Sequence, residues 1–317
     1  MAISDQYRRF AEHEARGKSP LYEAFAYGAA GDGDVLAFLQ TLPPAKRQPN
    51  LLFAAVRHLT GTPSDWTCFR HTLLTHLDAV RGVMLTRSTQ TNEPARCATL
   101  LPVLARLPQP LALIEVGASA GLCLLPDHYG YDYGRTSLRP ATTAPVFACT
   151  ASETTPIPSA MPRIVWRAGL DLNPIDIADP EQAAWLETLV WPEQTQRLSN
   201  LRAAMQVAMV ARPDLRKGNL LGDALRQLCG EAPSSATLVI FHTAVLAYIQ
   251  ERPLREAFAA QAMALAPFWI SNEGARVFPG IADRTEPDTG AGRFLLAVNG
   301  APLAWTDPHG AAIDWIG

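Results

Sequence analysis

This sequence of 317 residues contains few cysteines and few lysines. The cysteines lie far apart, form no Cys-x-x-Cys pair and are odd in number, which is typical neither of a disulfide framework nor of a zinc site. We therefore expect buried thiols and no metal. The scarcity of lysine, three of 27 basic residues, we attribute to genome composition. The five cysteines are Cys68, Cys97, Cys123, Cys149 and Cys229.

Long apolar runs and blocks of one charge are also missing. No segment approaches the ~18 consecutive apolar residues of a membrane-spanning helix. The first 17 residues mix acids with arginines, unlike a secretory signal or a transit peptide. The net charge is -3 and the basic residues form no stripe, which argues against a nucleic-acid partner. We expect a cytoplasmic protein that acts on a small molecule, without nucleic-acid or membrane partners.

Two common catalytic motifs are absent from the sequence. It has no P-loop and no H-E-x-x-H. NTPase and zinc-protease functions therefore lack support. The sequence does contain 48% apolar residues, enough for the core of one large or two ordinary domains.

A change of pattern near residue 108 divides the chain. Before it, apolar residues recur at three- and four-residue spacing, which predicts helices over 7–14, 34–42, 51–59, 65–81 and 94–107. Pro108-Gln109-Pro110 then interrupts the pattern. We predict a helical lid or substrate domain over 1–108 and a second domain over 109–317.

The second part alternates between short apolar runs and helical stretches, which predicts an α/β domain with a doubly wound, Rossmann-like parallel sheet. After it, Asn299-Gly300 between two apolar runs predicts an antiparallel hairpin. A segment rich in Tyr, Thr and Pro, about 126–162, is predicted to be an insertion with weak strand character. The predicted strands cover 111–116, 163–170, 218–221, 237–241 and 268–271, and the hairpin 293–298 and 302–306. The predicted helices cover 118–125, 180–189, 195–211, 224–229 and 254–266.

The most informative segment is the glycine turn that follows the first predicted strand, Ile114-Glu115-Val116-Gly117-Ala118-Ser119-Ala120-Gly121. Gly117 and Gly121 allow the backbone to approach a ligand closely, and the N–H groups of a helix beginning there favour polar or anionic groups. Ser119 stands where a dinucleotide fingerprint has its second glycine, which argues against a pyrophosphate. A purely structural turn would have the same pattern.

Acidic residues follow later strands. Asp171 ends the second predicted strand, where an acid can accept both hydroxyls of a ribose, although a turn or cap aspartate would look the same. It lies 56 positions after Glu115 (171 - 115) instead of about 20, so the insertion has to account for the difference. Asp132, closer to the usual distance, is the rival ribose ligand. Asp223, after the third predicted strand, is placed to accept a hydrogen from an adenine amino group.

The order EVGASAG, GLDLNP, GDAL, VIFHT and a terminal hairpin resembles the class I S-adenosylmethionine-dependent methyltransferase fold. More closely, QTNEPAR, EVGASAGL, GLDLNPID, VWPE and FHTAVLAY resemble a bacterial domain-of-unknown-function family (number 2332) over nearly the whole chain. The resemblance implies S-adenosylmethionine as cofactor, with its methionine part near Glu115, Gly117 and Gly121, its ribose on Asp171 and its adenine near Asp223. We also count Ser119, inside the loop, among the cofactor-binding residues.

Further polar residues are candidates for the chemistry. His242 ends the fourth predicted strand at the switch point of the sheet, where it is placed to take a proton from a methyl acceptor. The alternative is a histidine that bonds inside the sheet edge and only shapes the pocket. In Gln90-Thr91-Asn92-Glu93-Pro94-Ala95-Arg96, Glu93 is a second catalytic candidate and Arg96 a candidate carboxylate fork, although Asn92 and Glu93 also suit an ordinary helix start. The candidate substrate-binding residues are Asn92, Arg96, Thr243 and Glu273.

Three functional hypotheses follow from the sequence. The first is a methyltransferase that uses S-adenosylmethionine and acts on a small molecule. The second is a dinucleotide-dependent oxidoreductase, against which Ser119 argues. The third is a cofactor-fold protein that binds without catalysis, since a fold does not fix a function. The sequence indicates neither the substrate nor the oligomeric state.

Overall fold

A computed structural model describes residues 2–90, 92–286, 290 and 292–316. The chain forms two compact units. The first comprises residues 1–91 and 178–199, and the second residues 92–177 and 200–317. This division gives residues 92–107 to the second unit, whereas the sequence pattern assigned them to the helical domain, and it adds residues 178–199 to the helices of the first.

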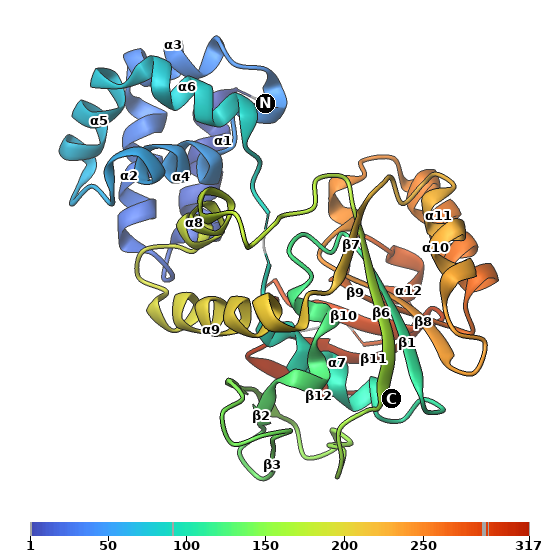
Figure 1. Cartoon of the computed structure of the whole chain (residues 1–317). Helices are drawn as coiled ribbons and strands as arrows, with labels where there is room; N and C mark the ends of the chain where they lie inside the picture. The colour runs from blue at the N-terminus through green and yellow to red at the C-terminus, as the bar shows by residue number, and fades with distance from the viewer. Residues whose placement is uncertain (1, 91, 287–289, 291, 317) are drawn as a thin grey trace. The chain divides into compact units, whose positions relative to one another are not determined.

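The first unit is helical (Figure 1), and it has its own aromatic core. Phe53 lies at its centre, fully buried, and its ring contacts five other aromatic rings. The helix predicted over 65–81 is in fact two helices, because the chain breaks its helical course at His76. The α-helices are α1 (Ile3–Phe10), α2 (Pro20–Gly31), α3 (Gly33–Gln40), α4 (Pro49–Thr60), α5 (Trp66–Thr75), α6 (Leu77–Thr86) and α8 (Pro180–Leu189).

The second unit contains a nine-stranded sheet of order β5-β12-β11-β10-β9-β8-β1-β6-β7. The strands β7, β6, β1, β8 and β9 are parallel, and their order reverses between β1 and β8. This is the strand order of a doubly wound fold, whose ligand crevice lies at the carboxyl ends of the strands at the reversal. The strands are β1 (Leu111–Val116), β5 (Thr150–Ala151), β6 (Ile164–Asp171), β7 (Asp214–Lys217), β8 (Thr237–Thr243), β9 (Phe268–Gly274), β10 (Phe294–Val298), β11 (Ala301–Thr306) and β12 (Ala312–Trp315).

The α/β fold class is confirmed, including the antiparallel hairpin at the C-terminal end. Asn299 and Gly300 both have positive φ, 48° and 75°, as a two-residue hairpin turn requires, and β10 pairs with β9 and β11 in antiparallel fashion. The sequence did not predict β12. The insertion forms a small separate sheet of β3 (Ser137–Leu138), β2 (Gly130–Asp132) and β4 (Val146–Ala148).

Helices cover the large sheet on both faces. On one face lie α10 (Ala224–Glu231) and α11 (Arg252–Leu265) (Figure 1). They bury an apolar cluster together with residues such as Ile114, Ile240 and Trp269. On the other face lies the fully buried α7 (Cys97–Leu104), preceded by the short turn η3 (Pro94–Arg96). The remaining α-helices are α9 (Thr195–Ala211), which continues from the first unit into the second, and α12 (Pro279–Ala282).

Two predicted elements are wrong. Residues 118–125 do not form an α-helix but tight turns and a 3-10 helix, η4 (Leu122–Leu124). Ser119 and Gly121 have φ of 50° and 70°, which is left-handed backbone that a right-handed helix cannot contain. The third strand runs over 214–217 instead of 218–221. Its residues were overlooked because an edge strand can be polar.

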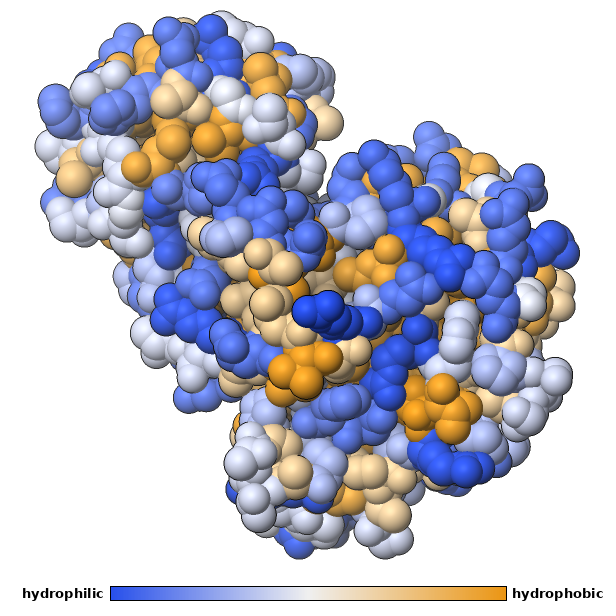
Figure 2. Space-filling model, in the orientation of Figure 1, coloured by the Kyte–Doolittle hydropathy of each residue, from blue (hydrophilic) through white to orange (hydrophobic). Residues whose placement is uncertain are grey.

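The surface has no dominant apolar area on the face shown in Figure 2, where apolar residues form small patches between polar ones on both units. Within the described residues, none of the helices has both the length and the apolar content to cross a membrane.

Candidate functional site

The glycine turn after β1 is tightly bound to the end of β6. The N–H groups of Gly117 and Ala118 both donate to the carbonyl of Leu170, and the N–H of Ser119 donates to Oδ2 of Asp171 at 2.8 Å. Asp171 also accepts the N–H of Asn173 on Oδ1 at 2.7 Å. Both carboxylate oxygens of Asp171, the residue predicted to bind the ribose, therefore already accept a backbone N–H group. Each oxygen still has a lone pair for a further donor.

The glycines of this turn are required by the protein's own packing. A Cβ on Gly117, whose φ is 71°, would lie 2.3 Å from Cγ2 of Val245. A Cβ on Gly121 would lie 2.8 Å from Leu215. Packing alone therefore explains why Gly117 and Gly121 are glycines, and these two positions do not by themselves indicate a ligand.

Strained backbone occurs on both sides of the switch point. Ser119, after β1, has a φ of 50°, and Ala244, after β8, has a φ of 57°. Each such residue costs on the order of 1–3 kcal/mol and is found most often at functional sites. The two strained turns flank the place where a doubly wound sheet binds its ligand.

Glu115 is a buried acid on β1, directly before the turn. Its side chain is 4% exposed, and Oε2 has no hydrogen-bond partner within the described residues. Burial raises the pKa of its carboxyl well above the usual range. The nearby Cys123 and Asp171 raise this pKa further, and the Arg96 guanidinium lowers it. A positively charged group beside Glu115 would favour its ionised form.

Two further polar atoms beside the turn are buried without a partner in the part of the chain that the structure describes. They are Oγ of Ser119 and Oδ1 of Asn92. Nδ2 of Asn92 donates to the carbonyl of Ala118 at 3.1 Å, which ties the segment before η3 to the glycine turn. Unsatisfied buried polar atoms are rare in native proteins and call for an explanation such as a ligand or an ordered water.

The strand register separates the candidate residues onto two faces of the sheet. Glu115 is paired with Phe241, and Thr243 with Asn272, so these side chains share the α7 face. His242 points to the opposite face, as does Glu273. His242 therefore does not lie on the same face of the sheet as Glu115.

His242 and Glu273 form a fully buried pair on the α11 face. Nδ1 of His242 lies 2.7 Å from Oε1 of Glu273, and the exposed fractions of the side chains are 0% and 3%. The imidazole ring contacts the rings of Phe258, Trp269 and Phe278. This is the arrangement expected of a histidine that bonds inside the sheet edge.

Glu273 also holds the segment against which the glycine turn packs. Its Oε1 accepts the N–H groups of Val245 and Leu246 at 2.8 and 3.0 Å. Val245 in turn fills the space beside Gly117. The pair thus fixes the turn after β8 and, through Val245, the turn after β1. A small pocket lined by Ser271, Glu273 and Phe278, among others, adjoins the pair.

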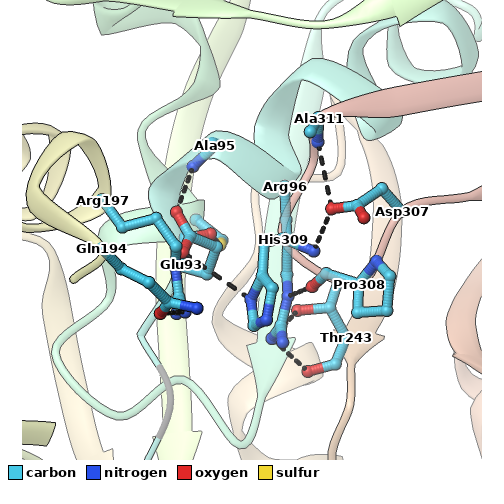
Figure 3. A network of polar contacts seen from close by, with 11 residues as sticks. Glu93, Ala95, Arg96, Gln194, Arg197, Thr243, Asp307, Pro308, His309 and Ala311 are labelled. Carbon is cyan, nitrogen blue, oxygen red and sulfur yellow. Dashed lines mark hydrogen bonds and ion pairs between the residues drawn. The ribbon is translucent and has the colours of Figure 1, made fainter. Parts of the chain in front are cut away.

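Arg96 is a buried anchor rather than a group displayed for a ligand. Nε donates to the carbonyl of Pro308 at 2.7 Å, and Nη1 donates to the carbonyl and Oγ1 of Thr243 at 3.2 and 3.3 Å (Figure 3). The side chain connects η3, the end of β8 and the turn between β11 and β12. Of the predicted substrate-binding residues, Arg96 and Thr243 are thus in direct contact.

A series of buried hydrogen bonds joins these elements and ends at the carbonyl of Arg96. Oγ1 of Thr306 donates to Oδ1 of Asn272, and Nδ2 of Asn272 donates to Oγ1 of Thr99 at 3.4 Å. Oγ1 of Thr99 donates to the carbonyl of Arg96 at 2.8 Å. This series of hydrogen bonds links β11, β9, α7 and η3.

Sequence reasoning missed His309, which lies beside Glu93 (Figure 3). Nδ1 of His309 is 3.8 Å from Oε2 of Glu93. Glu93 is 3% exposed, and its Oε1 accepts the N–H of Ala95 as the cap of η3. The available signal was Asp307-Pro308-His309-Gly310, a turn sequence that presents a histidine directly after a strand.

Two predicted nucleotide ligands are exposed acids. Asp132 is exposed at the end of β2, in the small sheet, where its Oδ1 accepts the N–H of Gly134. Asp223 is exposed just before α10, and it does not cap that helix with its side chain.

Comparison with known proteins finds a match at the level of the family. A family model described as "Uncharacterized protein conserved in bacteria (DUF2332)" matches residues 4–315. No curated protein and no solved structure matches the chain.

Proposed function

The chain belongs to this family of uncharacterised bacterial proteins, and we propose that it binds S-adenosylmethionine at the carboxyl ends of β1 and β6 and transfers a methyl group to a small molecule. The observation that carries the proposal is the group of buried polar atoms without partners, among the described residues, around the glycine turn. These atoms are Oε2 of Glu115, Oγ of Ser119 and Oδ1 of Asn92.

These atoms suit a ligand that is positively charged and rich in hydrogen-bond donors. A buried polar atom left unsatisfied costs about 1–3 kcal/mol, so three of them favour an occupant that donates to them. Glu115 and Asn92 would hold the ammonium of the methionine part, and Asp171 would accept from the ribose hydroxyls. A cation beside Glu115 would also offset the cost of ionising that buried acid.

When bound, S-adenosylmethionine supplies an electrophilic methyl group on a positively charged sulfur. The protein's contribution is to hold the methyl acceptor in line and to accept its proton. The strained turns at Ser119 and Ala244 lie on the two sides of the switch point of the sheet, where this would occur. The adenine end has weaker support, because Asp223 is exposed.

Isothermal titration of the full chain with S-adenosylmethionine and with its demethylated product, S-adenosylhomocysteine, tests the proposal. We expect binding of both, weakened about tenfold or more in Glu115→Gln, since that change removes an acceptor for a charged donor. Glu153→Gln, at an exposed acid of the same unit, is the matched control. Lack of binding of either compound to the native chain at high micromolar concentration would refute the proposal.

The burial of His242 favours one alternative, a protein that binds the cofactor without catalysis. A dinucleotide-dependent oxidoreductase is disfavoured, because the described glycine turn leads into η4 and not into an α-helix whose N-terminus would bind a pyrophosphate. Binding of S-adenosylhomocysteine without methyl transfer to any acceptor would favour the first alternative.

A further inference from the structure

The small pocket beside Glu273 has a buried floor and a partly exposed rim. Its floor is formed by Ser271 and Glu273 of β9 and by Leu295 of β10, all of which are buried. Glu273 and Leu295 are paired between the two strands, so their side chains share one face of the sheet. The rim is half-buried and includes Ala275, Phe278 and Ile281. A carboxylate therefore lies at the bottom of a pocket that a small molecule can enter from the surface.

One oxygen of this carboxylate has no partner. Oε1 of Glu273 accepts the N–H groups of Val245 and Leu246 and lies 2.7 Å from Nδ1 of His242. Oε2 is buried and has no hydrogen-bond partner among the described residues. In the same part of the chain, no arginine or lysine forms an ion pair with Glu273, whose side chain is 3% exposed. Buried charges in proteins are normally paired, so Oε2 is available to a charged donor from outside the chain.

Two polar atoms of neighbouring rings are also buried without a partner among the described residues. They are Nε2 of His242 and Nε1 of Trp269. The two rings stack on each other, and both contact the ring of Phe278 at the rim of the pocket. Because Nδ1 of His242 faces a carboxylate oxygen at hydrogen-bond distance, it carries the proton of the neutral ring, and Nε2 is an acceptor. Such a concentration of unsatisfied buried atoms calls for an explanation.

The size and lining of the pocket limit the chemistry of its ligand. At the floor there is room for a group of about the size of a water molecule. A primary ammonium has about that size and three N–H donors. The rim adds apolar surface from Ile281 and the phenyl ring of Phe278, whose face attracts cations. An anion would be repelled by Glu273, and a neutral hydroxyl would leave the buried charge without a counter-charge.

We propose that this pocket binds a small primary amine in its cationic form. The ammonium donates to Oε2 of Glu273, and the alkyl part lies against Phe278 and Ile281. The site lies on the α11 face of the sheet, whereas Glu115 lies on the α7 face. It is therefore distinct from the proposed cofactor site, and it does not rest on the proposed function.

Titration of the full chain with n-butylammonium at constant ionic strength, followed by the ¹³C-methyl signal of Ile281, tests the proposal. We expect a saturable shift with half-saturation at about 1 mM or below, and Ile281→Val assigns the signal. The neutral n-butanol and the anion butyrate should bind about tenfold more weakly or less, because neither brings a positive charge to Oε2. Equal affinity for n-butanol, or no saturable shift with n-butylammonium, would overturn the proposal and leave an ordered water molecule as the partner of Oε2.

Two variants locate the bound amine. Glu273→Gln keeps an acceptor for the backbone N–H groups but removes the charge, so it should weaken n-butylammonium binding about tenfold or more. Glu153→Gln, at an exposed acid, is its control. Ala275→Leu fills the half-buried rim without changing Glu273 and should weaken binding to a similar extent, whereas Ala232→Leu, at a half-buried alanine outside the pocket, should not. Native affinity in Ala275→Leu, or in folded Glu273→Gln, would overturn the proposal.

Discussion

At the residue scale, Gly117 shows how a glycine can be required by packing and by backbone conformation at once. Its φ of 71° suits glycine, and its missing Cβ leaves room for Val245. We expect Gly117→Ala to destabilise the second unit by about 2–5 kcal/mol, from strain of about 1–2 kcal/mol and an overlap of about 1–3 kcal/mol. Chemical denaturation, monitored by a probe in the second unit, measures this loss.

The control for Gly117 is Gly134, which also has a positive φ but has open space, with nothing within 4 Å, where a Cβ would lie. Gly134→Ala should therefore show only the strain, about 1–2 kcal/mol. Adding Val245→Ala to Gly117→Ala should recover part of the loss, because it removes the overlapping atoms. Equal losses in Gly117→Ala and Gly134→Ala would contradict the packing argument.

Glu115 gives a prediction about pH at the same scale. Because burial raises its folded-state pKa, the stability associated with this acid is fully present below the unfolded value of about 4.3 and is lost as the pH rises toward the folded value. In that interval the loss approaches about 1.4 kcal/mol per pH unit. Glu115→Gln cannot ionise, so between about pH 4.5 and 7 its free energy of unfolding should rise relative to that of the native chain.

Denaturant midpoints of the second unit at several pH values test this effect of Glu115. Glu153→Gln, which changes an exposed acid, should leave the pH profile parallel to the native one. Parallel profiles for Glu115→Gln and the native chain would show that the buried acid does not carry the predicted cost.

At the scale of elements, Asn272 joins β9 to both β11 and α7. Its removal in Asn272→Ala leaves the buried hydroxyls of Thr306 and Thr99 each without one partner. The hydroxyl of Thr99 still donates to the carbonyl of Arg96, so we expect a loss of about 1–3 kcal/mol, mainly from the hydroxyl of Thr306. In a double-mutant cycle with Thr306→Val, the two changes should be coupled by about 0.5–3 kcal/mol, since both break the same bond.

Thr136→Val, at an exposed threonine of the second unit, is the control for this cycle and should stay within about 0.5 kcal/mol of the native chain. If the losses in free energy of unfolding of Asn272→Ala and Thr306→Val were strictly additive, the hydrogen bonds from β11 to α7 would not be coupled.

The C-terminal hairpin and the glycine turn show which sequence signals are sufficient to predict local structure. Asn299-Gly300 predicted the hairpin correctly, because the turn depends on two residues that accept positive φ. The apolar spacing of residues 118–125 predicted a helix wrongly, since Ser119 and Gly121 have left-handed backbone and the N–H of Ser119 donates to the distant Asp171. The spacing of apolar residues alone cannot reveal such a hydrogen bond.

For the candidate site, the sequence predicted which edge of the sheet carries the residues but not the face on which each side chain lies. Strand ends located the glycine turn, Asp171 and Thr243 at one edge, as parallel strands require. The face on which each side chain lies depends on the register between strands, which is why His242 and Glu115 were expected together and lie on opposite faces. His309 was missed because its neighbour Glu93 is more than 200 residues away in the sequence.

At the scale of the whole molecule, the two units have separate apolar cores. Phe53 is fully buried at the centre of the first, and Phe258, on α11, is fully buried in the core of the second. Replacing a buried phenylalanine by alanine costs about 3–5 kcal/mol. Phe53→Ala and Phe258→Ala should therefore lower different transitions when unfolding is followed by calorimetry.

The same pair of variants shows which unit holds the ligand. A ligand stabilises only the unit whose native state binds it, by about 2.7 kcal/mol at 100 times its dissociation constant. Since the residues proposed to bind S-adenosylhomocysteine all belong to the second unit, the ligand should raise the transition that Phe258→Ala lowers and leave the other in place. A ligand-induced shift confined to the transition that Phe53→Ala lowers would instead assign binding to the helical unit. It would refute the ligand site proposed at Glu115, Ser119 and Asn92.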